Sequence, residues 1–191
     1  MFTGIIEAIG TVKKIETKGT NIHFWVESPF FPELKIDQSV AHDGVCLTID
    51  AIEGQFYRVT AIKETLEKTN LNHWNINKKV NLERGMILGS RLDGHLVQGH
   101  VDCTGTCIAI KEEDGSWLYT IEYPENFRIL IIEKGSICMN GTSLTAFNLI
   151  GNTFSVAIIP YTYNATNINE LHPNSIVNLE FDLVGKYVLN L

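Results

Sequence analysis

Short stretches in which apolar and polar residues alternate are the main pattern of this chain. The clearest of them span residues 23–27, 55–60, 118–122 and 153–159. They are rich in aromatic and β-branched side chains, which predicts β-strands. Turn-forming pairs such as Glu53-Gly54 and Asp114-Gly115 separate the stretches. Short strands at a spacing of roughly ten residues are typical of antiparallel barrels and sandwiches, so we expect an all-β fold.

Helical periodicity is rare in the sequence. Residues 64–69 favour one or two helical turns, and a counterpart is expected to begin after Pro160. Residues 183–191 place apolar side chains at helical spacing, which predicts a short C-terminal helix.

The chain contains an internal duplication. Residues 39–83 align without a gap on residues 136–180, and sixteen of the forty-five positions are identical, whereas composition alone gives roughly three. Upstream, the repeat continues at an offset of ninety-five, so that Gly4 aligns with Gly99. This period is longer than the about 20–50 residues of solenoid repeats. The sequence therefore predicts two domains, 1–90 and 91–182, followed by the terminal segment 183–191.

Composition excludes several classes of function. The net charge is −7 and no basic run is present, which disfavours nucleic-acid binding. No apolar stretch approaches the ~20 residues of a membrane-spanning helix, and no signal peptide is recognisable at the N-terminus. We therefore expect a cytoplasmic protein.

Cysteine and histidine spacing does not favour a metal site. The four cysteines form no C-x-x-C pair and fit reduced thiols. His95, His100 and Cys103 lie near one another in the sequence, but their spacing is irregular and no fourth ligand is evident. We expect no metal.

Seven motifs occur in order on this duplication. They are Met-Phe-Thr-Gly-Ile-Ile-Glu at residues 1–7, Ser-Val-Ala-His-Asp-Gly-Val-Cys-Leu-Thr at 39–48, Glu-Thr-Leu-x-x-Thr-Asn-Leu at 64–71, Val-Asn-Leu-Glu-Arg at 80–84, Gly-His-Leu-Val-Gln-Gly-His-Val-Asp at 94–102, Gly-Thr-Ser-Leu-Thr at 141–145 and Ile-Pro-Tyr-Thr-x-x-x-Thr-Asn at 159–167. Each motif alone is weak. Together, along the entire length, they resemble the alpha-type (trimeric) riboflavin synthases.

The resemblance implies a fold and a reaction. The expected fold is two tandem six-stranded Greek-key barrels, with a short C-terminal helix that assembles a homotrimer. The expected activity is that of a transferase in the last step of riboflavin biosynthesis: two molecules of 6,7-dimethyl-8-ribityllumazine exchange a four-carbon unit, giving riboflavin and 5-amino-6-ribitylaminouracil. The carbon chemistry resides in the substrate, so no cofactor is expected. Two lumazines occupy each active site, between the N-terminal barrel of one subunit and the C-terminal barrel of another. The resemblance also names lumazine synthase as a candidate partner.

Positions at which the repeats differ are the candidates for catalysis. Cys46 aligns with Ser143, His100 with Ile5, and Asp182 with Gly85. The resemblance implies functional roles for Cys46, His100, Ser143 and Asp182. His100 is suited to shuttle a proton because imidazole titrates near neutrality, and we expect it to act as a pair with Ser143. Cys46 is either a contact or a nucleophile or base, and both alternatives stay open.

Substrate binding is assigned to positions that the resemblance places near the ligand, several of which occur in both repeats. These positions are Gly4, Ile5, Ser39, Thr48, Ala61, Thr65, Thr69, Gly99, Thr145, Ile159, Thr162 and Thr166. We interpret the repeated Val-Asn-Leu-Glu strands at 80–83 and 177–180 as structural.

Two other functions compete with this interpretation. A non-catalytic lumazine- or flavin-binding antenna protein shares the duplicated barrels, but it lacks catalytic positions that this chain retains. A flavin domain of the reductase type carries an Arg-x-Tyr-Ser signature that is absent here. The sequence does not indicate which barrel holds the donor lumazine.

Overall fold

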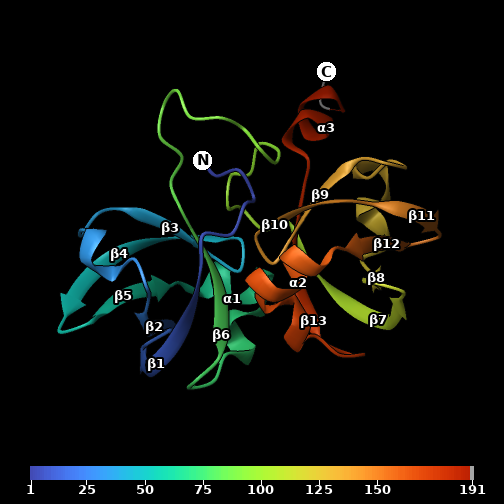
Figure 1. Ribbon diagram of the computed structural model, residues 1–191. Helices are drawn as coiled ribbons and strands as arrows, with labels where there is room; N and C mark the ends of the chain where they lie inside the picture. Colours follow the sequence, from blue (N-terminus) through green and yellow to red (C-terminus); the bar gives the residue numbers. More distant parts are fainter. Residues whose placement is uncertain (190–191) are drawn as a thin grey trace.

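The computed structural model describes residues 1–189 as two β-units that lie side by side (Figure 1). The first unit is a closed barrel in the order β1-β2-β5-β4-β3-β6. Its strands are β1 (Ala8–Lys18), β2 (Asn21–Glu27), β3 (Ser39–His42), β4 (Val45–Glu53), β5 (Phe56–Ala61) and β6 (Lys79–Arg84). The prediction of an all-β fold is confirmed.

The second unit repeats this topology as a seven-stranded sheet in the order β10-β9-β13-β7-β8-β12-β11. Its strands are β7 (Cys103–Glu113), β8 (Ser116–Glu122), β9 (Ser136–Met139), β10 (Thr142–Thr145), β11 (Phe147–Ile150), β12 (Thr153–Ile158) and β13 (Ile176–Phe181). The strand that corresponds to β4 is divided at the buried Ala146 into β10 and β11. The two outermost strands of the sheet are thus consecutive in the chain. The second of the two expected six-stranded barrels is therefore a seven-stranded, half-barrel sheet, and we call this unit the second barrel below.

Alternating burial builds each core, as the sequence pattern predicts. In β5, Tyr57, Val59 and Ala61 are buried, while the residues between them are partly exposed. A separate apolar core fills each unit.

Short helices connect the strands. They are α1 (Lys63–Lys68), α2 (Pro160–Ala165), α3 (Leu183–Val188) and the 3-10 turns η1 (Phe31–Glu33), η2 (Asn70–His73), η3 (Glu125–Leu130) and η4 (Asn167–Glu170). The first two α-helices occupy equivalent places in the repeat, as expected. The predicted terminal helix is present as α3, and residues 190–191 lie outside the described part. Within residues 1–189, no helix has the length and apolar character needed to span a membrane.

A buried amide network joins the two units. Asn81 on β6 accepts the Asn167 backbone N–H at 2.7 Å through its side-chain oxygen. The mirror contact runs from the Asn70 N–H to the Asn178 side chain, also at 2.7 Å. Each of these asparagines is at least 95% buried. The repeated strands are therefore structural, as interpreted, and they carry much of the contact between the units.

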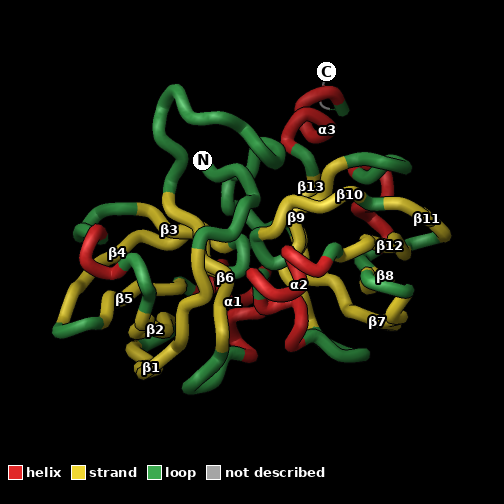
Figure 2. Tube along the Cα trace, viewed as in Figure 1, coloured by secondary structure: helices red, strands yellow, loops and turns green. Residues whose placement is uncertain are grey.

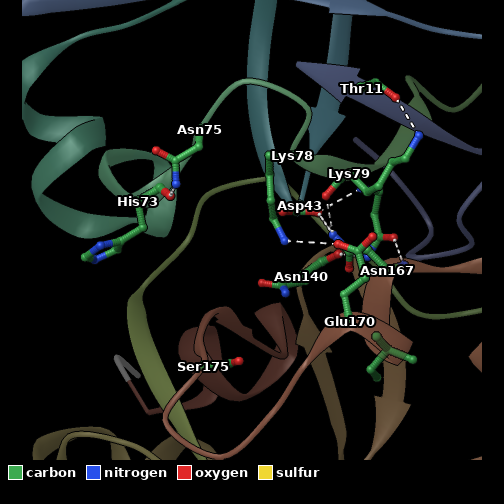
Figure 3. A network of polar contacts seen from close by, with 12 residues as sticks. Thr11, Asp43, His73, Asn75, Lys78, Lys79, Asn140, Asn167, Glu170 and Ser175 are labelled. Atoms are coloured by element: carbon green, nitrogen blue, oxygen red, sulfur yellow. Dashed lines mark hydrogen bonds and ion pairs between the residues drawn. The ribbon is translucent and has the colours of Figure 1, made fainter. Parts of the chain in front are cut away.

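Asp43 is the position at which this network departs from its internal symmetry, because its counterpart in the second repeat is Asn140. Figure 3 shows Asp43 beside Asn167, with Lys78, Lys79 and Glu170 around them. The Asn167 amide donates to one Asp43 oxygen at 2.8 Å. The other Asp43 oxygen and the Asn167 side-chain oxygen are both buried without a hydrogen-bond partner.

A proton on Asp43 would supply the missing donor between these two acceptors, as in a carboxylic acid–amide pair. Burial raises the pKa of Asp43 to about 7, against a smaller opposing effect of the Lys78 charge. The neutral acid is thus the form that the folded state favours, and it resembles the amide of Asn140.

We predict that Asp43→Asn removes a pH-dependent cost of folding. The unfolded carboxyl loses its proton near pH 3.8, whereas the folded one keeps it to about pH 7. Wild-type stability contributed by this group therefore falls across that window, by up to about 1.4 kcal/mol per pH unit. The stability of the variant relative to wild type should rise from pH 4 to 7 and then level off in urea titrations.

The stability of Asp43→Asn must be compared with that of wild type because a second buried group, His42, also titrates in this pH range. Burial lowers its pKa to about 4, so its contribution to stability rises with pH across the same window. Both proteins carry His42, and its effect cancels in the difference. A stability difference that stays constant from pH 4 to 8 would contradict the assignment to Asp43.

Candidate active site

Two segments outside the barrels cross between the units, and we call them the arms. The first arm, residues 2–7, precedes the first barrel, and the second, residues 97–102, precedes the second. Both are loop in Figure 2, and they meet in an antiparallel bridge between Phe2 and Val97. The Gly4 carbonyl accepts the N–H of Ser143 at 2.8 Å, and the Gly99 carbonyl accepts the N–H of Cys46 at 2.8 Å. Each arm therefore lies against the barrel of the other repeat.

Repeated glutamates hold the arms. Glu83 accepts the Thr3 hydroxyl and the backbone N–H groups of Thr3 and Gly4 at 2.7–2.9 Å. Glu180 accepts the N–H groups of Gln98, Gly99 and His100 at 2.7–3.0 Å. Burial raises the pKa of both carboxyls, while the N–H donors act in the opposite direction. These contacts give the last residue of the Val-Asn-Leu-Glu motif a positioning role.

Glycine is required where the arms touch the barrels. Gly4 and Gly99 have φ of 77° and 78°, a conformation that L side chains rarely adopt. A Cβ on Gly99 would lie 2.6 Å from the Cys46 Cβ, and one on Gly4 would lie 2.7 Å from the Ser143 Cβ. The repeated glycines thus allow the arm backbone to contact the other barrel.

The second barrel carries a cavity of about 560 Å³ beside the first arm. The cavity unites four predicted site residues, namely Ser143, Thr145, Ile159 and Thr162. Lys134, Ser136 and Phe147 also line it, and the Lys134 ammonium lies 4.6 Å from the centre of the Phe147 ring. A larger cavity of about 780 Å³ is lined by Ile5, by Ser39 and by residues of the linker between the units, which we define as residues 85–96.

Ser143 is hydrogen-bonded to a histidine that the sequence suggested only as a metal ligand. The Ser143 Oγ and the His95 Nδ1 are 2.7 Å apart. The His95 Nε2 is buried and lacks a partner. Burial lowers the pKa of His95, and the charge of Asp182 opposes this shift. A neutral imidazole beside a hydroxyl can accept its proton, but no periodicity or spacing in the sequence indicated this contact.

The first barrel presents an equivalent but chemically different site. The backbone of Gly99, which precedes His100, lies against Cys46, and Cys46 occupies the place of Ser143. His100 is exposed, and Cys46 is partly exposed. Because the arms cross, the arm that carries His100 lies within one chain against the barrel of Cys46, and Ser143 lies beside His95. The pairing of His100 with Ser143 was expected between subunits and stays a prediction.

Three predicted binding residues have other roles in the structure. Ala61 is fully buried in the first core, whereas its neighbour Ile62, the repeat partner of Ile159, is 52% exposed. Thr69 and Thr166 are buried, and their hydroxyls cap η2 and η4.

The other predicted residues differ in exposure and contacts. Thr48 pairs with Ser39, and both are exposed. Thr65 is partly exposed on α1. Asp182 accepts the Val184 N–H as the N-cap of α3, which is a structural contact.

Comparison with known proteins shows the family to which this chain belongs. The family model described as the lumazine binding domain matches twice, over residues 3–85 and 98–182. The duplicated barrels thus define a lumazine-binding protein. The chain is 38% identical to the riboflavin synthase of Actinobacillus pleuropneumoniae over 98% of its own length and 88% of that protein. It is 35% identical to the Bacillus subtilis enzyme over the same shares, and 38% identical to the Mycobacterium bovis enzyme over 100% and 98%. The chain belongs to the riboflavin synthase family.

Solved structures confirm the fold. A structure of LumP complexed with riboflavin matches with a TM-score of 0.89 at 23% identity, covering 95% of this chain and 99% of that chain. A complex of LumP with 6,7-dimethyl-8-(1'-D-ribityl) lumazine matches with a TM-score of 0.87 at 21% identity and the same coverage.

We predict that Gly99→Ala displaces the second arm. Gly54→Ala is the matched control, because Gly54 also has positive φ but nothing within 4 Å of an added Cβ. Both variants share a backbone cost of about 1–2 kcal/mol, and only Gly99→Ala adds a clash with Cys46. Hydrogen exchange of the Cys46 amide should accelerate in Gly99→Ala alone. Equal protection in the two variants would contradict this interpretation of the contact.

Proposed function

We propose that this protein is a riboflavin synthase that binds two molecules of 6,7-dimethyl-8-ribityllumazine and transfers a four-carbon unit from one to the other. The products are riboflavin and 5-amino-6-ribitylaminouracil. Full-length similarity to riboflavin synthases supports this activity. The observation in the structure that carries it is the pair of related but chemically unequal sites, each completed by the arm of the other repeat.

Unequal sites suit this reaction because identical substrates must play different roles. One lumazine loses a proton from its C7 methyl group, and the other accepts a nucleophile. The first site offers His100 and Cys46, and the second offers the Ser143–His95 pair. Holding both lumazines in register would turn a bimolecular step into an effectively unimolecular one. We propose that Thr48 and Thr65, and likewise Thr145 and Thr162, bind the ring and the ribityl chain.

A direct assay tests the activity. The purified protein is mixed with 6,7-dimethyl-8-ribityllumazine, and riboflavin absorbance and green fluorescence are followed over time. Growth of the riboflavin signal at half the rate of lumazine loss supports the proposal. Tight lumazine binding without turnover would instead indicate the antenna function, for which the fold likeness to LumP is the only support.

We further propose that the protein is a homotrimer and that α3 contributes to its assembly. Val184, Tyr187 and Val188 have helical spacing and are 60%, 67% and 63% exposed. Burial of such side chains is worth about 1.5–3 kcal/mol each before entropy costs. In the trimer, the first barrel of one subunit would face the second barrel of another, which brings His100 and Ser143 to one active site.

Removal of residues 183–191 should therefore dissociate the assembly. Light scattering is expected to give the mass of a monomer, which is 21.4 kDa for the intact chain less the deleted tail. Full-length protein at the same concentration is the control. An unchanged oligomer would show that the barrels themselves form the interface.

We predict that His100→Gln and Ser143→Ala each lower turnover by about 10²–10⁴-fold, the usual contribution of a positioned acid or base. Ligand affinity should change far less, because both substitutions keep the shape of the pockets. Single-turnover kinetics and fluorescence titration separate the two effects. Asn81→Ala serves as a structural control and should lower the melting temperature through loss of buried hydrogen bonds. Wild-type turnover by a well-folded His100→Gln would contradict its role.

A further inference from the structure

The duplication allows the two arms to be compared position by position. Glu7 and Asp102 are equivalent at the offset of ninety-five, and Arg84 and Phe181 at the offset of ninety-seven. Glu7 accepts the backbone N–H of Arg84 at 3.0 Å. Asp102 accepts the backbone N–H of Phe181 at 2.8 Å. Both carboxylates thus tie the end of an arm to the last strand of its own repeat.

The two carboxylates are neutralised by cations that come from different elements of the fold. In the first repeat it is Arg84 itself, whose guanidinium lies 2.7 Å from Glu7. Phe181 has no charge, and the cation comes instead from α3: the Lys186 Nζ lies 2.6 Å from the Asp102 carboxylate. The Lys186 and Asp102 side chains are 20% and 19% exposed, against 38% and 32% for Arg84 and Glu7. The pair on α3 is therefore less screened by solvent.

Lys186 acts where the arm carrying His100 is anchored. Glu180 holds the backbone N–H groups of the arm up to His100, and Asp102 fixes the arm two residues later. Between these anchors, Val101 packs against the core of the first barrel. The charge of Lys186 lowers the pKa of Glu180, against the effects of burial and of Asp102. One cation thus stabilises both carboxylates that hold the arm.

We propose that Lys186 is a positioning residue: through Asp102 it fixes the second arm, which carries His100 and contacts the first barrel at Cys46 through Gly99. This inference rests on the proposed riboflavin synthase activity and names a further residue required for it. Because Lys186 is on α3, the helix proposed to assemble the trimer also sets the position of His100.

The first test is Lys186→Met, which keeps the aliphatic stem and removes the charge. We expect turnover to fall by about 10–100-fold, the order of loss caused by small misplacement of a reacting group, while KM and the oligomer mass change little. The acid limb of the activity profile should move to higher pH, because Glu180 without Lys186 takes up its proton sooner. Lys186→Arg should restore turnover. Lys111→Met, which breaks the exposed pair with Glu113, is the control and should behave as wild type.

A double-mutant cycle separates positioning from general stability. If Lys186 acts through His100, Lys186→Met should have almost no further effect on turnover in the His100→Gln background. Equal losses in both backgrounds, or wild-type turnover by Lys186→Met, would overturn the inference.

Hydrogen exchange gives a readout that does not depend on the reaction. The amides of Gly99 and His100 should exchange faster in Lys186→Met than in wild type and in Lys111→Met. Unchanged protection would overturn the inference even in an active enzyme. Absence of riboflavin formation by the wild-type protein would overturn the proposed function instead, and the exchange measurement would still decide whether Lys186 holds the arm.

Discussion

The structure depends on a reciprocal set of buried hydrogen bonds between the two repeats. The side chains of Asn81 and Asn178 accept backbone N–H groups that belong to the opposite unit. Separation of the units would exchange these bonds for bonds to water, at a net loss of about 0.5–1.5 kcal/mol for each. Gly44 and Gly141 allow the close approach, because a Cβ on Gly44 would lie 2.7 Å from the Gly141 nitrogen. The repeats are thus two topological units that are stabilised as one body.

The crossing of the arms follows from this close contact and determines the chemistry. Each arm leaves its own repeat and contacts the other barrel, at Cys46 in one case and Ser143 in the other. A substitution in one arm therefore changes the site of the opposite repeat. The two sites therefore differ both in the arm that completes them and in the barrel residue that the arm contacts, and a reaction between two identical substrates is served by such a difference.

Much of this architecture was predictable because the duplication is visible in the sequence. Alternation gave the strands, and alignment of the repeats gave the positions at which the sites differ. The crossing was not predictable, since an arm is adjacent in sequence to its own barrel and periodicity carries no information on the partner of a loop.

Thr69 and Thr166 show a second limit of prediction from the sequence. Their repetition predicts a shared role, but it does not reveal that both residues are buried and cap a turn. The role of His95 was also missed, because its contact with Ser143 joins residues far apart in the chain and periodicity does not reveal such contacts.

The repeats differ at both arms and at their anchors, while the network between the barrels stays nearly symmetrical. Ile5 is replaced by His100 at the tip of the arm, and Arg84 is replaced by Phe181 at its anchor. The second change leaves Asp102 without a cation on its own strand, and α3 supplies one. The first repeat has no equivalent helix, because its last strand leads directly into the linker. The arm that carries a histidine is thus the one anchored by the C-terminal helix, whereas the arm without a histidine is anchored by an arginine at the end of its own last strand.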